Sequence, residues 1–154
     1  MSAAEKKSVL RKSAKSKAAT AKPNALKNTV RANVDATGTL KYLAWNDVEV
    51  EAMNPLLGRQ LIVGQQVMLA RVLLKKGCVV PLHSHVNEQL SYILQGALKF
   101  YIDGKEIVVR AGEVLTIPPN MPHKAEAMED TVDLDIFNPP RADWINKTDS
   151  YLRK

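Results

Sequence analysis

Two of the three histidines in the chain lie one residue apart, within the stretch GCVVPLHSHVNEQLSYILQG at residues 77–96. This stretch has the composition of a half-buried strand, and successive side chains of a strand point to opposite faces. His83 and His85 are therefore expected on one face, with the small Ser84 pointing away. Neutral imidazoles are common ligands of divalent transition metals. The spacing predicts one half of a metal site.

The third histidine, His123, follows the turn-forming sequence IPPNMP and opens another expected strand. If that strand lies beside the first, three imidazoles converge. Alternation continued along the chain puts Gln89 on the histidine face and Glu88 on the other, although a loop at residues 86–87 would reset the phase. The fourth ligand stays open between these two residues, with the alternation favouring Gln89. Because imidazole and oxygen ligands suit Mn, Fe, Co, Ni and Zn alike, the metal is not specified.

A second group of polar side chains lies in TVDLDIFNPPRADW, residues 131–144. Asp133, Asp135 and Phe137 share one face of the expected strand. If that face lines the site, Asp135 can serve as a general acid or base and Phe137 can form a wall beside the substrate. Arg141 can then bind a carboxylate through two parallel hydrogen bonds. The alternative is an ordinary ion pair between Asp135 and Arg141.

The elements that must position these residues are short strands rich in Val, Ile, Leu and Tyr, separated by Gly, Pro, Asn and Asp. An Asp-Gly pair at residues 103–104 predicts a two-residue hairpin turn, and a short helical turn is expected within RADWINK. Such a pattern is typical of an all-β sandwich or barrel. The expected strands cover residues 60–63, 66–74, 89–95, 97–102, 105–110, 113–117, 123–128 and 131–137.

The positive charge of the chain, +6 in total, belongs to its first part. Residues 1–41 hold ten Lys or Arg against two acids, whereas residues 42–154 hold twelve against fourteen. The first part lacks apolar periodicity, so we expect a disordered basic tail followed by one folded domain. The tail is either a solubilising extension or a contact for nucleic acid or another polyanion. The chain has one cysteine, Cys78, and we expect no apolar run of the roughly 18–20 residues that a membrane segment needs. Its start also lacks the apolar core of a secretory signal. These features favour a cytoplasmic protein without membrane segments.

Two spaced motifs carry a resemblance to a known family. The first, G-x5-H-x-H-x3-Q-x6-G, occupies residues 77–96, and the second, G-x5-P-x-N-x2-H, occupies residues 112–123. Together they resemble the two motifs of the cupin superfamily, which implies a double-stranded β-helix, or jelly-roll barrel, over about residues 42–152. The chain departs from most cupins at two positions, with Gln89 in place of a glutamate and Asn120 in place of a glycine.

The sequence HSHVNEQLSYILQG, together with D-x-F-x3-R, is similar to the small cupins of the pectin-degradation type. This resemblance implies opening of 4,5-unsaturated galacturonate or mannuronate to a linear 4-deoxy-5-keto uronate, and a homodimer. The alternatives are another metal-dependent lyase, a dioxygenase, or a non-catalytic module that binds a small carboxylate or sugar. The resemblance implies metal ligation by His83, His85, Gln89 and His123, and active-site roles for Asp135, Phe137 and Arg141.

Overall fold

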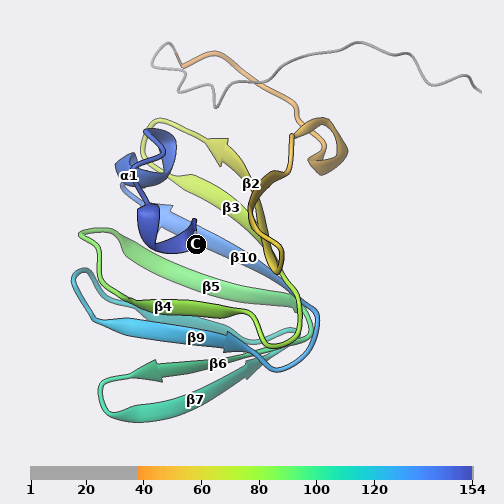
Figure 1. The fold of residues 1–154 in the computed structure, drawn as a ribbon. Coiled ribbons are helices and arrows are strands. Elements are labelled where there is room, and N and C mark those ends of the chain that lie inside the picture. The colour runs from red at the N-terminus through yellow and green to blue at the C-terminus, as the bar shows by residue number, and fades with distance from the viewer. Residues whose placement is uncertain (1–37, 154) are drawn as a thin grey trace, which may run out of the picture.

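A computed structural model describes residues 38–153 of the chain. Two antiparallel β-sheets form the body, and short helical turns lie near both ends of the described range (Figure 1). The predicted basic tail at residues 1–41 falls almost entirely outside the described residues. Among residues 38–153, no helix is both long enough and apolar enough to cross a membrane.

The two sheets interleave strands that are distant in the sequence. One sheet has the order β1-β2-β3-β10-β5-β8 and the other the order β4-β9-β6-β7. This interleaving is typical of a jelly roll and confirms the predicted all-β class. The strands are β1 (Glu51–Asn54), β2 (Leu57–Val63), β3 (Met68–Leu74), β4 (Val79–His83), β5 (Glu88–Gln95), β6 (Ala97–Ile102), β7 (Lys105–Arg110), β8 (Val114–Ile117), β9 (His123–Ala127) and β10 (Thr131–Asn138).

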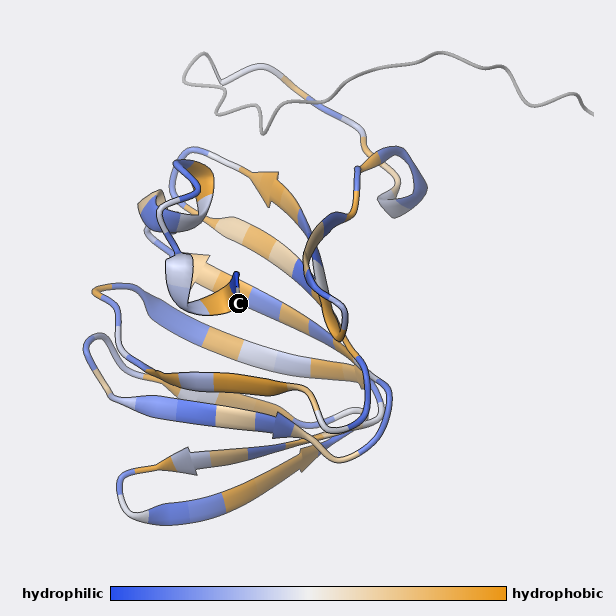
Figure 2. Ribbon diagram, in the orientation of Figure 1, coloured by the Kyte–Doolittle hydropathy of each residue, from blue (hydrophilic) through white to orange (hydrophobic). Residues whose placement is uncertain are grey.

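The core lies between the sheets because several strands bury every second side chain. Burial alternates along β3 and β10, and Met68, Ile93 and Phe100 are almost fully buried. Burying such a side chain stabilises the fold by roughly 1.5–3 kcal/mol. Figure 2 shows hydrophobic and hydrophilic segments interspersed along the strands. On β10 the buried set includes two aspartates, so the interior is polar there.

Short turns connect the strands and complete the described chain. Asp103 and Gly104 both have positive φ, of 50° and 70°, and join β6 to β7 in the predicted two-residue hairpin. The expected helical turn is α1 (Ala142–Ile145). Two 3₁₀ turns, η1 (Trp45–Asp47) and η2 (Ser150–Leu152), and strand β1 were not predicted, whereas β4 lies within residues 77–96, which were expected to be half-buried strand.

Candidate metal centre and active site

The three histidines meet at one end of the barrel. Strand β4 pairs with β9 so that His83 lies opposite His123, and one ring nitrogen from each of the three histidines lies within 4.8 Å of the others. The expectation that both early histidines stand on one strand is wrong, because β4 ends at His83 and His85 lies in the following loop. The backbone N–H of Asn120, which has a φ of 63°, donates to the carbonyl of His85 at 2.7 Å and holds that loop.

Backbone carbonyls select the protonated nitrogen of two histidine rings. Nδ1 of His83 lies 2.8 Å from the carbonyl oxygen of Pro81, and Nδ1 of His123 lies 2.8 Å from that of Met121. A carbonyl can only accept, so each Nδ1 carries the proton and each Nε2 keeps a lone pair. Nε2 of His123 is buried without a hydrogen-bond partner. An unpartnered imidazole nitrogen in a polar cluster fits a metal ligand whose other nitrogen is fixed by a backbone carbonyl.

Burial keeps the three imidazoles neutral at physiological pH. It lowers the pKa of His83 to about 4, helped by the neighbouring His123, and it lowers the pKa of His85 to about 4, helped by Arg141. The pKa of His123 is lowered for the same reason. Only neutral imidazole binds a metal, so the three rings form a set of donors that requires no loss of protons.

Gln89 turns its carbonyl oxygen toward the histidines. Its amide Nε2 donates to Oδ1 of Asp135 at 2.8 Å and lies 2.9 Å from Oγ of Ser91, and Oε1 lies 3.0 Å from Nε2 of His85. Since only the NH₂ group can donate to a carboxylate, this network fixes which end of the amide faces the histidine cluster. Gln89 is buried, whereas Glu88 is exposed on the other face of β5. The two residues therefore lie on the sides that strand alternation predicted.

Asp135 lies next to Gln89 in the barrel interior. Its Oδ1 also accepts a hydrogen bond from Oγ of Ser91 at 2.5 Å. Burial raises the pKa of Asp135 to about 6, although the hydrogen bonds from Ser91 and Gln89 and the charge of Arg141 act in the opposite direction. The adjoining Asp133 is also buried, and burial together with the charge of Asp135 raises its pKa well above the ordinary value. Asp135 can thus gain or lose a proton near neutral pH.

Arg141 does not form the ion pair with Asp135 that the sequence left as an alternative. Its Nε and Nη2 donate to the two carboxylate oxygens of Asp143, at 2.9 and 2.7 Å. The guanidinium lies over the rings of Phe137 and Trp144, at 5.3 and 4.9 Å from their centroids. Its Nη1 is buried without a partner. A buried guanidinium edge with no acceptor suits an anionic ligand.

A narrow cavity of about 40 Å³ joins these groups. All of the predicted site residues except His85 line it, and His85 packs edge-on against Phe137, whose ring is a wall of the cavity. Trp144 and Leu152 from the C-terminal segment complete the wall and were not predicted as site residues. No sequence pattern marks them, because they lie in two short helical turns with no periodicity. The other lining side chains are Leu57, Val72, Leu74, Val80, Leu98, Phe100, Ala125 and Asp133.

Comparison with known proteins agrees with this fold. A model of the cupin domain matches residues 70–138. The pectin degradation protein KdgF of Dickeya dadantii is 24% identical over 108 residues, which cover 68% of this chain and 98% of that protein. An oxalate-binding protein of Thermotoga maritima is 33% identical over 90 residues, 58% of this chain and 73% of that protein.

Solved structures give the same result. The structure of KdgF from Halomonas sp. superimposes with a TM-score of 0.65 at 25% identity, covering 69% of this chain and 99% of that one. An RmlC-like cupin from Shewanella frigidimarina has a TM-score of 0.65 at 26% identity, covering 69% and 96%. With its two histidine motifs, its jelly-roll topology and these relatives, the chain belongs to the cupin family.

Proposed function

We propose that this cupin is a metal-dependent enzyme that opens the ring of 4,5-unsaturated uronates, such as the galacturonate or mannuronate derivative, to the linear 4-deoxy-5-keto form. The observation that carries the proposal is the contact between Gln89 and Asp135, which joins the histidine cluster to a buried acid with a pKa near neutral. The similarity to pectin degradation protein KdgF supports the substrate class.

In this proposal His83, His85 and His123 provide three imidazole nitrogens, and Gln89 provides an amide oxygen. A divalent cation held there would act as a Lewis acid on substrate oxygens. None of the four ligands carries a negative charge, so the polarising power of the cation would be reduced less than in a site that includes a carboxylate. The nitrogen and oxygen donors agree with Mn, Fe, Co, Ni or Zn.

Asp135 is the proposed acid–base group. Ring opening moves one proton from the C1 hydroxyl, breaks the bond between C1 and the ring oxygen, and adds one proton at C4, so the atomic composition does not change. A carboxyl with a pKa of about 6 is populated in both protonation states near neutral pH and can perform both transfers. Ser91 and Gln89 hold the carboxyl through Oδ1, and a side-chain hydrogen bond with Asp133 further fixes its position.

Arg141 is the proposed binding group for the uronate carboxylate. Asp143 occupies its Nε and Nη2 edge, so the unpartnered Nη1 is the part that can meet the substrate. Phe137, which lies beneath the guanidinium, would limit the space beside the sugar ring.

The test follows loss of the conjugated chromophore of unsaturated galacturonate with protein loaded with each of the five metals in turn. The wild-type protein should exceed the spontaneous rate, Asp135→Asn should lose turnover, and Arg141→Lys should raise KM. Asp130→Asn is the matched control, because Asp130 is an exposed acid paired with Lys75 outside the cavity. A wild-type rate no faster than the spontaneous one with every metal would refute the proposal.

A second candidate function is binding of a smaller carboxylate without turnover, and the size of the cavity favours it. At about 40 Å³ the cavity is far below the roughly 300–1,000 Å³ of pockets for drug-sized ligands. The similarity to an oxalate-binding protein supports a small dicarboxylate. Stabilisation of the metal-loaded protein by oxalate, without loss of oxalate over time, would favour this candidate.

The remaining expectations concern the whole chain. The division into a tail at residues 1–41 and a cupin domain at residues 42–154, the homodimer, the contact of the tail with polyanions and the cytoplasmic location all stay predictions.

A further inference from the structure

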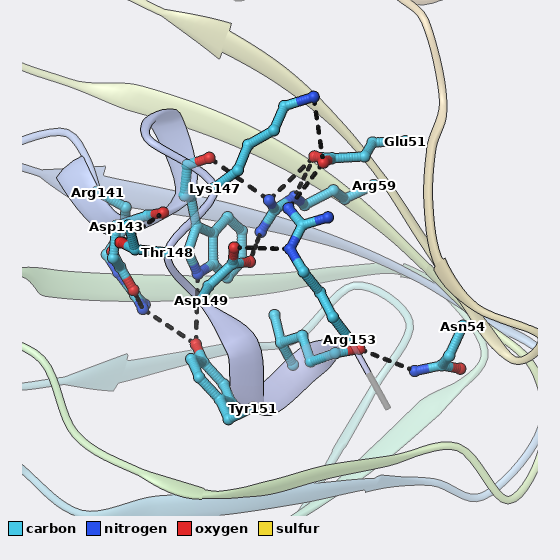
Figure 3. Close-up of polar contacts among 12 residues, drawn as sticks. Glu51, Asn54, Arg59, Arg141, Asp143, Lys147, Thr148, Asp149, Tyr151 and Arg153 are labelled. Atoms are coloured by element: carbon cyan, nitrogen blue, oxygen red, sulfur yellow. Dashed lines mark hydrogen bonds and ion pairs between the residues drawn. The ribbon is translucent and has the colours of Figure 1, made fainter.

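The segment that closes the described chain is anchored to the first strands of the fold. Nη1 of Arg59 on β2 pairs with Asp149 at 2.5 Å, and both side chains are almost completely buried. Arg153 binds Glu51 of β1 at 2.7 Å and Asp149 at 3.2 Å (Figure 3). A buried charge without its partner is costly, so this network fixes the position of η2. Neither anchoring strand lies within residues 70–138, the part matched by the cupin domain.

Tyr151 of η2 contacts two parts of the candidate site. Its ring stacks on the imidazole of His83, with a centroid distance of 4.7 Å and an interplanar angle of 26°. Its hydroxyl oxygen accepts from Nη2 of Arg141 at 3.0 Å and from Nε1 of Trp144 at 3.3 Å. Figure 3 shows the hydroxyl directed toward Arg141. A phenol oxygen has two lone pairs, and both are used here.

We propose that Tyr151 is a positioning residue that holds a metal ligand with its ring and the carboxylate-binding arginine with its hydroxyl. The role assigned to Arg141 rests on the proposed function, whereas the contact with His83 depends only on metal binding. No sequence pattern indicated Tyr151, and it lies outside the matched cupin residues.

The ring of Tyr151 completes the positioning of His83. The hydrogen bond from Nδ1 to the carbonyl of Pro81 fixes one edge of the imidazole but leaves the ring free to tilt about that bond. Stacking of Tyr151 on the flat face restricts this tilt. One nitrogen of this imidazole lies within 4.8 Å of a ring nitrogen of each of the other two histidines, and Nε2 is the nitrogen that keeps a lone pair, because Nδ1 donates to Pro81.

The hydroxyl of Tyr151 completes the positioning of Arg141. A guanidinium has five N–H groups. Asp143 accepts from one on Nε and one on Nη2, and Tyr151 accepts from Nη2 as well. The two groups that remain are both on Nη1, which is buried and unpartnered. The geometry therefore leaves one edge of Arg141 for the carboxylate of a ligand.

The first part of the test measures binding of Mn²⁺ alone to the metal-free full chain, by competition with a chelator. Tyr151→Phe keeps the ring and should bind Mn²⁺ within about twofold of the wild-type protein. Tyr151→Leu removes the ring and should bind about tenfold more weakly, in the range found when groups supporting a metal ligand are lost. Tyr101→Phe is the matched control, since it removes a tyrosine hydroxyl that binds Glu126 outside the cavity. Equal Mn²⁺ affinity for the Phe and Leu variants at position 151 would overturn the His83 part of the proposal.

The second part measures kcat and KM for unsaturated galacturonate. Tyr151→Phe should raise KM about tenfold with a small change in kcat, as expected when a hydrogen bond to a charged group is removed; Tyr101→Phe should change neither. An unchanged KM in Tyr151→Phe would overturn the Arg141 part. If the wild-type protein shows no turnover, the proposed function fails, and the affinity of the Mn²⁺-loaded protein for oxalate is measured instead. The same weakening of oxalate binding is then expected for Tyr151→Phe, and its absence would also overturn the Arg141 part.

Discussion

Replacement of Gln89 by alanine is the most informative change at the candidate metal centre. It removes the oxygen that lies 3.0 Å from Nε2 of His85, together with the amide that binds Asp135 and Ser91. Loss of a group that merely supports a ligand weakens metal binding about 10–100-fold, so loss of a proposed ligand should weaken it at least that much. The lost buried hydrogen bonds should also reduce the free energy of unfolding by about 1–3 kcal/mol. Chelator competition measures the first effect and urea unfolding of the metal-free protein the second.

Two controls separate ligation from general damage. Glu88→Ala changes the exposed neighbour of Gln89 on the other face of β5. It should alter Mn²⁺ affinity by no more than about twofold, because the side chain lies away from the histidine cluster and substitutions at such exposed positions have small effects. Ser91→Ala removes one partner of the Gln89 amide but leaves Oε1 in place. If Glu88→Ala weakened metal binding as much as Gln89→Ala, or if Gln89→Ala bound metal normally, the placement of the fourth ligand at Gln89 would be refuted.

Three further predictions concern pH, metal and folding. The folded-state pKa of Asp135 is raised to about 6, so the protonated carboxyl stabilises the folded protein at low pH. As pH rises from about 4 to 6, the unfolding free energy of the metal-free wild-type protein should therefore fall by up to about 3 kcal/mol relative to that of Asp135→Asn. Urea unfolding of both proteins across this pH range measures the difference. A pH-independent difference would contradict this. Removal of metal by a chelator should lower Tm. Compared with protein in free metal at 100 times Kd, the metal-free protein should have an unfolding free energy about 2.7 kcal/mol smaller. An unchanged Tm would count against a metal site. Arg59→Met removes the buried partner of Asp149 and leaves Arg153 as its remaining ion-pair partner. The unfolding free energy should fall by about 3–5 kcal/mol. A loss below about 1 kcal/mol would show that the pair between Arg59 and Asp149 is not needed to fix η2.

Most of the strands could be predicted because one face of each is buried, which leaves a period of two in the sequence. Strand β4 is the informative exception. It contains Pro81 and has no residue that is fully buried, so burial leaves no pattern in Val79–His83. Residues 77–96 have the composition of one strand, but without a burial pattern the sequence could not show that the structure divides them into β4, a loop and β5.

The donors of the candidate site could be predicted because their chemistry is a property of residue type. Histidine and glutamine at these spacings indicate a metal site through residue type and order alone. Alternation along β10 correctly put Asp135 and Phe137 on one face, and the structure shows that this face is interior. The partner of Arg141 could not be predicted. The sequence allowed Asp135, and the turn of α1 brings Asp143 to the guanidinium instead.

The sequence by itself determined which donors are present, their order along the chain and the all-β fold that carries them. Only the tertiary structure decided which groups meet. His83 lies opposite His123 because β4 pairs with β9. Tyr151 reaches His83 because a buried ion pair anchors the η2 segment to β2 and a partly exposed one anchors it to β1. The physical reason is that contact, burial and pKa depend on distances between segments far apart in the sequence, and local periodicity carries no information about those distances.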